Sequence, residues 1–569
     1  MKKNNNTYDD WKKSDLIKEI LELKKEKLGL VWEDQNEEEL EALKNNFPYA
    51  EEIVDQRILN DKELPVNSIF EGENLHTLSL LNFTHKGAFD LIYIDPPYNT
   101  GARNWIYNND FTDKEDSYRH SRWLSFMSKR LKLSKPLLKK DGVLICAIDE
   151  NELAHLVCIL ENIFKSHEIH IISIVHNPGG KQGKNISYTH EYAVFVIPKN
   201  KRTFLNKKLH QSEIRTSPLR NWGGESERKH GKNTFYPIVV KNNEIIEFGE
   251  VCKPSFHPDK RNIEGEDNTT LIYPIDDKGI ERKWRYQKDK FSEIKDQLVI
   301  SKSKSGDLDI KITKKEGTYK SFWNDSKYDA STYGTKLLRG ILKDCKFDFP
   351  KSLWTTYDCL DAIIGENKDA LVLDFFAGSG TTGHAVLEMN NNDGGNRSFI
   401  LCSSDENPEI NIPKKITYER IKKIISGYKN LHSGKTEKAI KANLKYYKIH
   451  LKKGGTDDSS KKSLGKKIED LILIKENGIE QLNKSKEYKL FSSNKGLIVI
   501  VPDIINLPSA IERIKEFEEP IIFYIFSFSD EDFSEEIDEI SNLSKVNTYP
   551  EPYMLSHNNA LRKVKWYSS

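Results

Sequence analysis

The strongest constraint on the fold is an alternation of short apolar runs with longer amphipathic stretches, found in two separate blocks of the chain. In residues 66–198, the runs FDLIYID (89–95) and GVLICAID (142–149) are separated by stretches with helical spacing. In residues 331–430, LVLDFF (371–376) precedes the helical TTGHAVLEMN and then SFILCSS. Strands that alternate with helices predict an α/β fold with a doubly wound, mostly parallel sheet covered on both faces.

The remaining segments differ in character from these two blocks. Residues 1–65 are highly charged and have helical spacing, whereas residues 199–330 are basic, aromatic and irregular. The Lys-rich segment 451–467 is typical of a linker, and apolar runs at 497–505 and 521–529 predict strands of a small α+β terminal domain. The sequence therefore predicts five parts: residues 1–65, 66–198, 199–330, 331–430 and 431–569.

Composition excludes several classes of protein. The chain is 37% hydrophobic and 31% charged, and no apolar run approaches the roughly 20 residues of a membrane span. The N-terminus MKKNNNTYDDWKK is polar and has no apolar stretch of a secretory signal, so we expect a cytoplasmic protein without membrane contact. The six cysteines are scattered without a C-x-x-C pair, so neither a metal site nor a disulfide framework is expected.

The net charge of +1 conceals a basic region in the middle of the chain. Residues 199–330 hold 28 Lys and Arg against 21 Asp and Glu, an excess of +7. Such a region fits a polyanionic partner, although a Lys-rich solvated surface gives the same count. Within it, IERKWRYQK (280–288) interleaves cations with aromatic rings. We predict nucleic-acid contacts at four of its residues, with a solvated basic strand as the alternative: Arg282, Lys283, Trp284 and Arg285.

One turn with chemical potential follows the predicted strand that ends at Asp374. In DFFAGSGTTG (374–383), Gly378 and Gly380 form a tight turn that opens a helix and lets a ligand approach the backbone closely. The third glycine of a dinucleotide fingerprint is missing, and no G-K-[ST] supplies a phosphate site. The turn therefore indicates a cofactor site of another kind, or a tight loop without a ligand.

A second turn, IDPPYNTG (94–101), directly follows another buried strand. Pro96 and Pro97 stiffen it, because proline continues neither a strand ladder nor a helix. The carboxylate of Asp95 and the carbonyl of Pro96 could accept the two N–H groups of an exocyclic amine, and Tyr98 could stack on a base. The alternative is a rigid turn capped by an aspartate.

Together, D-P-P-Y and F-x-G-x-G at strand ends of one α/β framework resemble the amino-methyltransferases of DNA. Asp95 precedes Asp374 by 279 residues, with the basic region between them. This order resembles the beta group of that family, a circular permutation of the usual cofactor-first arrangement. The resemblance implies a fold of the S-adenosylmethionine-dependent methyltransferase type, with residues 199–330 as an inserted target-recognition domain.

Further segments resemble the modification (Mod) subunits of type III restriction–modification systems, over about residues 28–430. They are GLVWED, ENLHTLSLLNFTHKG, YNNDF after the proline turn, DSYRHSRWLSFMSKRL, and the stretch from GGNRSFILCSSDEN to ITYERIKKII. The resemblance implies S-adenosyl-L-methionine as cofactor, double-stranded DNA as substrate, a homodimer, and an ATP-dependent restriction (Res) subunit as partner. The sequence has no P-loop of its own.

The resemblance also assigns roles to residues. Asp95, Pro96, Pro97 and Tyr98 would hold a flipped-out adenine for methylation at N6. The cofactor-binding residues would be Asp374, Phe376, Gly378, Gly380, Lys351 in FDFPKSL (347–353), where the usual second proline is Ser352, and Glu406, with Asp405 as its competitor for the ribose.

Four alternatives stay open. They are a solitary adenine methyltransferase, an N4-cytosine enzyme, an RNA methyltransferase, and a non-catalytic, sequence-specific DNA-binding subunit.

Overall fold

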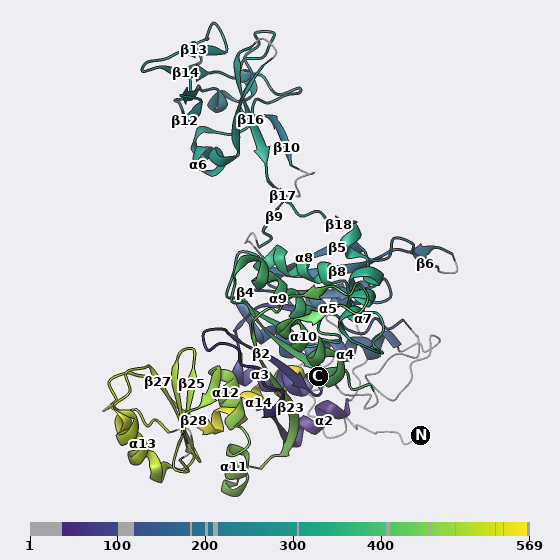
Figure 1. Ribbon diagram of the computed structural model, residues 1–569, viewed down its shortest axis with the longest axis vertical. Coiled ribbons are helices and arrows are strands. Elements are labelled where there is room, and N and C mark those ends of the chain that lie inside the picture. The colour runs from purple at the N-terminus through teal and green to yellow at the C-terminus, as the bar shows by residue number, and fades with distance from the viewer. Residues whose placement is uncertain are drawn as a thin grey trace, which may run out of the picture. The chain divides into compact units, whose positions relative to one another are not determined.

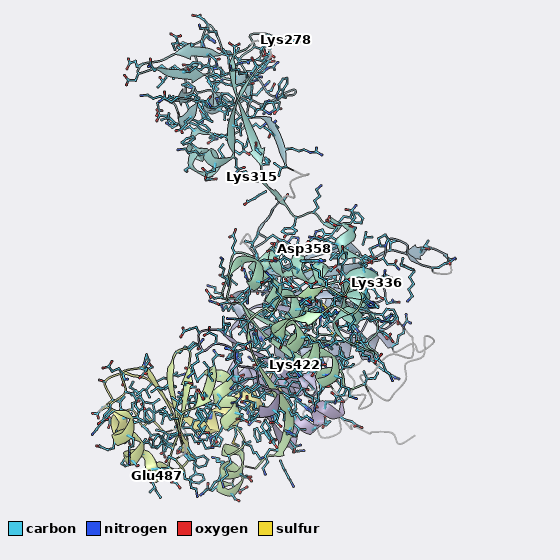
Figure 2. All side chains as sticks on the ribbon, viewed as in Figure 1. Lys278, Lys315, Lys336, Asp358, Lys422 and Glu487 are labelled. Atoms are coloured by element: carbon cyan, nitrogen blue, oxygen red, sulfur yellow. The ribbon has the colours of Figure 1, made fainter. Side chains whose placement is uncertain are left out.

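The computed structural model shows two compact units, one formed by residues 1–205 and 320–569 and the other by residues 206–319 (Figure 1). We call them the sheet unit and the inserted unit. Figure 2 draws their side chains, with Lys278 and Lys315 marking the inserted unit and Lys422 the sheet unit. The structure describes residues 37–100, 119–182, 185–199, 203–208, 214–303, 306–404, 410–455, 457–483, 485–529, 531–538 and 540–565.

The sheet unit is built on a ten-stranded sheet in which six of the nine neighbouring pairs are parallel. The predicted doubly wound, mostly parallel α/β fold is therefore confirmed. In spatial order, the strands are β1 (Asn46–Glu52), β23 (Asn443–Lys453), β2 (Val66–Glu71), β20 (Ser398–Ser403), β19 (Leu371–Asp374), β3 (Phe89–Ile94), β4 (Leu138–Ile148), β8 (His190–Pro198), β5 (His167–Val175) and β18 (Phe322–Trp323).

Helices cover both faces of this sheet. On β3, Ile92 and Ile94 belong to the same buried cluster as Trp123 of α4, whereas Tyr93 between them lies near Cys359 of α8. Side chains of a strand alternate between faces, so α4 and α8 cover opposite sides. Helices that pack with α4 (Arg119–Ser134) are α3 (Asn74–Thr84), α5 (Leu153–Ile163) and α14 (Glu551–Lys565). The other group is α7 (Leu337–Ile341), α8 (Leu353–Ile364), α9 (Thr381–Asp393) and α10 (Glu419–Ser426).

Neighbouring strands β3 and β19 form the switch point of the sheet. They run parallel, with Val372 opposite Leu91 and Leu373 opposite Ile92. From β3 the chain passes through α4 to β4 on one side, and from β19 it passes through α9 to β20 on the other. Open α/β sheets bind ligands where the strand order reverses in this way. Both motif-bearing turns leave the sheet at this point, along the same edge.

The N-terminal part differs from the expectation of an all-helical segment. Residues 1–36 lie outside the described part of the chain, and α2 (Glu38–Asn45) is a helix. Residues 46–52, however, form β1, which pairs antiparallel with β23. Phe47 and Ala50 of β1 are buried, so helical spacing in the sequence was overridden by the available sheet edge.

The expected linker at 451–467 is wrong. β23 continues to Lys453, and α11 (Asp458–Gly465) follows, with the Asp457 side chain accepting the Ser460 N–H at 3.0 Å. A Lys-rich composition hides these elements because the charges face solvent while residues such as Leu444 and Leu464 are buried.

The C-terminal part adds a five-stranded sheet to this unit. Its members are β24 (Gly478–Gln481), β25 (Lys489–Ser493), β26 (Gly496–Val501), β27 (Ile521–Ser527) and β28 (Leu543–Pro550), with α12 (Glu469–Lys475) and α13 (Leu507–Ile514) beside them. The last helix, α14, returns to the main sheet's helices, where His557 Nδ1 lies 2.8 Å from the Ser79 hydroxyl of α3.

The inserted unit consists of small antiparallel sheets around a core that contains Tyr236, Trp284 and Ile310. Its strands are β9 (Asn206–Lys208), β10 (Arg215–Pro218), β11 (Ile238–Lys241), β12 (Glu244–Phe248), β13 (Asn262–Glu264), β14 (Thr269–Ile272), β15 (Leu298–Lys302), β16 (Leu308–Lys314) and β17 (Glu316–Thr318), with the short α6 (Phe291–Ile294). Among the helices described in the two units, none has both the length and the apolar character to cross a membrane.

Candidate active site

Asp95 stands at the end of the buried strand β3, where Pro96 and Pro97 stop the strand ladder. Its side chain is 27% exposed, and its Oδ1 lies 3.4 Å from Lys351 Nζ. Burial raises the pKa of Asp95, and the positive charge of Lys351 offsets part of this effect. The carboxylate is therefore held at the carboxyl end of a central strand, with access to solvent.

Side chains outside the turn hold the backbone of residues 97–99 in place. Trp123, fully buried in α4, donates its indole N–H to the Pro97 carbonyl at 2.7 Å. Asn99 adopts φ 53°, and its amide donates to Glu152 Oε1 at 2.5 Å. No donor among the described residues reaches the carbonyl of Pro96. Asp95 and Pro96 thus present two hydrogen-bond acceptors from a rigid backbone.

Lys351 and Glu191 complete the surroundings of the turn. Lys351, just before α8, is 11% exposed, and Glu191 of β8 is 7% exposed. The ammonium group of Lys351 bonds both the Glu191 carboxylate and the Tyr98 hydroxyl, and lies 4.5 Å from the centroid of the Tyr98 ring. The Tyr98 hydroxyl also lies 3.2 Å from Glu191 Oε2. The tyrosine is therefore fixed at its hydroxyl end by a cation and a carboxylate.

The charges in this group stabilise one another. Burial disfavours the ammonium form of Lys351, but the carboxylates of Asp95 and Glu191 outweigh burial and raise the pKa of Lys351. Burial likewise opposes ionisation of Glu191, but Lys351 and His176 outweigh it and lower the pKa of Glu191. The triad is therefore held as one cation between two carboxyl groups.

The glycine turn after β19 is built around Asp374. Its Oδ1 accepts the Phe376 N–H at 2.9 Å and its Oδ2 accepts the Thr382 hydroxyl at 2.6 Å. Burial raises the pKa of Asp374 to about 7. Gly378 has φ 47° and Gly380 has φ 76°, so both require the left-handed region. A Cβ at Gly378 would lie 3.1 Å from the ring of Phe347.

A buried arginine of α10 holds the far side of this turn. Arg420 is fully buried and donates to the Ser379 hydroxyl at 3.1 Å and to the Thr381 hydroxyl at 2.9 Å. Phe376 is 6% exposed, with its ring centroid 5.9 Å from that of Phe126. The turn thus offers a fixed backbone at the N-terminus of α9, where N–H groups can bind a polar ligand.

The two turns share one end of the sheet. β3 and β19 are hydrogen-bonded neighbours, and the charge of Asp95 is close enough to raise the pKa of Asp374 further. The structure also brings Lys351, predicted near the cofactor, to the Asp95 turn. Glu406 and its competitor Asp405 lie outside the described residues.

Three residues of this region were not predicted from the sequence: Trp123, Glu191 and Arg420. A glutamate inside the apolar run EYAVFVIP was a usable signal for Glu191, because a charge rarely enters a buried strand without a partner. Trp123 and Arg420 carry no comparable signal.

Of the predicted nucleic-acid contacts, Trp284 is corrected by the structure. It is 1% exposed, and its indole N–H donates to the Tyr236 carbonyl at 2.8 Å inside the core of the inserted unit. Arg282, on the same side, bonds Asp276 Oδ2 at 2.8 Å. Alternate residues of an extended segment face opposite sides, so Lys283 and Arg285 face away from this core, Arg285 exposed and Lys283 half-buried beside Gly231.

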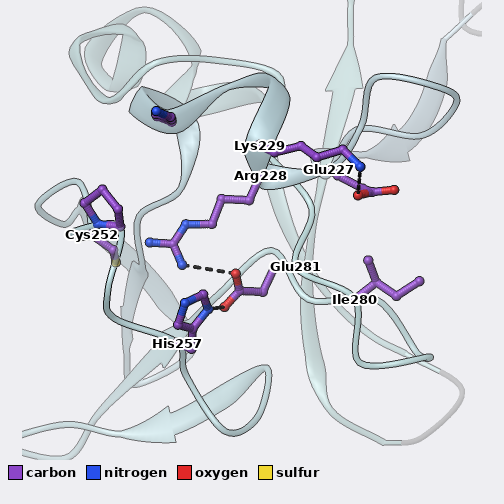
Figure 3. A pocket seen from close by; sticks show the side chains of 9 residues that line it. Glu227, Arg228, Lys229, Cys252, His257, Ile280 and Glu281 are labelled. Atoms are coloured by element: carbon purple, nitrogen blue, oxygen red, sulfur yellow. Dashed lines mark hydrogen bonds and ion pairs between the residues drawn. The ribbon is translucent and has the colours of Figure 1, made fainter.

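A hollow of about 430 Å³ lies in the inserted unit (Figure 3) and contains none of the residues above. Five of its charged or titratable side chains are paired with one another, Glu227, Arg228, Lys229, His257 and Glu281. Arg228 donates to Glu281 Oε2 at 3.1 Å, and His257 Nδ1 lies 2.9 Å from Glu281 Oε1. Because these groups satisfy each other, the hollow gives no support for a second reactive site.

Comparison with known proteins places the chain in a family. The sequence pattern of the DNA methylase family of N6 and N4 methyltransferases matches residues 89–426, and the chain belongs to this family.

Individual relatives agree. The EcoPI Mod subunit of a type III restriction–modification enzyme from Escherichia phage P1 is 30% identical over 68% of this chain and 65% of its own length. Type II methyltransferase M.KpnI of Klebsiella pneumoniae is 33% identical over 60% of this chain and 81% of its own. The StyLTI Mod subunit of Salmonella typhimurium is 28% identical over 65% of this chain and 57% of its own. The chain thus spans less than two thirds of the two Mod subunits.

Proposed function

We propose that this chain is a site-specific DNA methyltransferase that transfers a methyl group from S-adenosyl-L-methionine to N6 of a flipped-out adenine. One observation carries the proposal: the Asp95 and Pro96 acceptors and the Gly378–Gly380 turn leave neighbouring strands at the switch point of the sheet. A base amine held by the first turn would then meet a methyl donor held by the second.

The geometry supports the chemistry of the amine. Its nitrogen is a poor nucleophile because its lone pair is delocalised into the ring. Hydrogen bonds from its two N–H groups to Asp95 and the Pro96 carbonyl would localise that pair and stabilise the positive charge that develops on nitrogen. The nitrogen takes the methyl group as the carbon–sulfur bond breaks, the sulfur keeps the electron pair of that bond as a neutral thioether, and one proton of the nitrogen then passes to water. Stacking on Tyr98 would offset part of the cost of flipping the base.

The donor fits the glycine turn. Sulfonium chemistry supplies an electrophilic methyl group, and this chain supplies a backbone that approaches closely at Gly378 and Gly380 beside the N-terminus of α9. Asp374 shapes the turn and Phe376 lines it. Lys351 and Glu406 remain proposed contacts for the carboxylate and the ribose of the donor.

The wider context is also a proposal. The names of the Mod relatives support a modification subunit of a type III system. We propose in addition that it acts on double-stranded DNA, as a homodimer and with a Res partner. In this proposal the inserted unit reads the target, with the outward Lys283 and Arg285 contacting DNA. M.KpnI, named as a type II methyltransferase, is a relative of similar identity outside the type III systems, so an enzyme without a Res partner remains the alternative.

The first experiment identifies the base. The protein is incubated with duplex DNA and S-adenosylmethionine, and the DNA is digested and analysed by nucleoside mass spectrometry. We expect N6-methyladenine. N4-methylcytosine alone would overturn the adenine assignment, and DNA binding without any methylated base would indicate a non-catalytic subunit.

The second experiment tests the partner. The protein is purified with a candidate Res subunit, and ATP-dependent cleavage of unmethylated DNA is measured. Long-read sequencing of the methylated genome then gives the recognition sequence. Methylation on both strands of a palindrome, without cleavage, would favour the solitary enzyme.

A further inference from the structure

A second group of chemically competent side chains lies behind the Asp95 turn. It comprises His120 at the start of α4, Glu152 just before α5 and His155 in the first turn of α5. His120 Nδ1 is 2.7 Å from Glu152 Oε1, and His155 Nδ1 is 2.9 Å from Glu152 Oε2. The two imidazole rings stack with their centroids 4.4 Å apart.

The carboxylate of Glu152 is buried between the two histidines and the amide of Asn99. Its side chain is 0% exposed, and among the described residues no lysine or arginine forms an ion pair with it. Glu152 Oε2 and His155 Nδ1 are both buried, yet neither makes a hydrogen bond of acceptable geometry, although they are 2.9 Å apart. Asn99 and His120 satisfy the Oε1 atom of Glu152, but the buried Oε2 has no hydrogen bond, so a cation at Oε2 would offset the cost of its burial.

We propose that His120, Glu152 and His155 bind a divalent first-row transition-metal ion of the zinc type. One nitrogen from each histidine and one carboxylate oxygen all lie within 4.8 Å of one another. Two imidazoles and one carboxylate are a ligand set that zinc uses, with a fourth position left for water. Magnesium and calcium prefer all-oxygen ligands, so they are disfavoured here.

A similar pair elsewhere shows what a simple hydrogen bond needs. In the inserted unit, His257 Nδ1 also lies 2.9 Å from a glutamate, Glu281, but the guanidinium of Arg228 pairs with that carboxylate. Glu281 is therefore compensated by a protein cation, whereas Glu152 is not. The pair His257–Glu281 supplies a matched control.

Arg119 is a nearby cation that would compete with the metal for His120. Its Nε donates to His120 Nε2 at 3.2 Å. Coordination through Nδ1 of His120 would place the ring proton on Nε2 and displace this contact. Removal of the Arg119 side chain should therefore strengthen metal binding, which a purely structural hydrogen-bond network would not predict.

The site would act on the base turn through Asn99. The Asn99 amide donates to Glu152 Oε1 at 2.5 Å, and Asn99 directly follows Tyr98. A metal that fixes Glu152 would fix the left-handed conformation of Asn99 and hence the position of the turn. This role is structural, and no step of the proposed reaction passes through the metal.

The test uses the full chain without a polyhistidine tag, stripped with EDTA, in a Cys158→Ser background because Cys158 is an exposed thiol on the same helix. Zinc chloride is titrated by calorimetry, and cobalt(II) is added as a spectroscopic probe. We expect one zinc per chain and a visible cobalt absorption band. The variants E152Q and H155N should weaken binding at least about tenfold, R119A should strengthen it, and H257A should leave it unchanged.

The outcomes separate the alternatives. Absence of zinc binding, or binding that E152Q and H155N leave unchanged, would overturn the proposal. If E152Q fails to fold, H155N and H120N decide, because these two side chains are 29% and 34% exposed and tolerate a polar replacement. Metal affinity is measured without DNA or methyl donor, so the result is independent of the proposed methyl transfer.

Discussion

Two neighbouring strands carry an aspartate at the carboxyl end, Asp95 directly after β3 and Asp374 as the last residue of β19, and the two carboxyl groups have different partners. Asp374 is 2% exposed, and its two carboxylate oxygens accept hydrogen bonds from nearby donors, the Phe376 N–H and the Thr382 hydroxyl. Asp95 keeps a partly exposed side chain and faces Lys351, which arrives from 256 residues further along the chain. The first carboxyl shapes a turn, and the second is available to a ligand.

The difference teaches where reactivity comes from in this fold. Asp95 and Asp374 occupy equivalent positions at the carboxyl ends of their strands. Whether a carboxylate oxygen stays available to a ligand depends on the residues that surround it. Local partners satisfy Asp374 completely. Distant partners adjust the charge of Asp95 without occupying it fully.

The largest expected effect is the loss of methyl transfer on substitution of Asp95. The Asp95→Ala variant should lower the rate of methyl transfer by about 10²–10³-fold or more, since one acceptor for the developing charge is removed. DNA binding should stay within about twofold, because the turn is held by Trp123 and Asn99 rather than by Asp95. Single-turnover kinetics and a DNA-binding titration check this, and equal loss of both would refute the assigned role.

At Asp374 the larger effect should fall on stability. The Asp374→Ala variant leaves the Phe376 N–H and the Thr382 hydroxyl without acceptors, which should cost about 2–3 kcal/mol of unfolding free energy. Asp374→Asn retains one acceptor and should cost less. Urea denaturation measures both, and if the two variants were equally stable, Asp374 would not be the organiser of the turn.

A smaller effect on ligand binding distinguishes the turn at Gly378 from a glycine whose substitution causes backbone strain alone. Gly378→Ala forces a Cβ toward Phe347 at φ 47° and should weaken S-adenosylmethionine binding about tenfold. Gly394, at the other end of α9, has φ 68° and open space around it, so Gly394→Ala carries similar strain without a ligand. Calorimetry should show weakened donor binding for the first variant alone.

The smallest effect is the pH dependence of stability. Burial raises the pKa of Asp374 to about 7 in the folded chain, above its value of about 3.9 when unfolded. The stability due to this group is therefore complete below pH ~4 and is lost as pH rises toward 7. Between pH 6 and 7, Asp374→Asn should reduce the fall in unfolding free energy by about 1 kcal/mol. Chemical denaturation at both pH values tests this, and an unchanged slope would contradict it.

The elements that carry the motifs were predictable from the sequence, because strands buried on both faces are apolar runs bounded by turn residues. This held for β3 and β19. It failed where burial is one-sided: the surface lysines of β23 and α11 gave the appearance of a linker, and the basic stretch around Trp284 hid an alternation between core and solvent. Partners such as Glu191 and Arg420 could not be assigned, since their positions depend on which strands become neighbours.

Because neighbouring strands of the main sheet are far apart in the sequence, the ribosome synthesises them at different times. Strand β2 ends at Glu71, but its neighbours β20 and β23 are made more than 320 residues later. At a synthesis rate of roughly 5–20 residues per second, strand β2 therefore lacks hydrogen-bonding partners on both sides for tens of seconds. The strands of the inserted unit pair only with one another, so that unit can fold during the wait. Nascent chains should therefore depend on chaperones for the sheet unit and not for the inserted one.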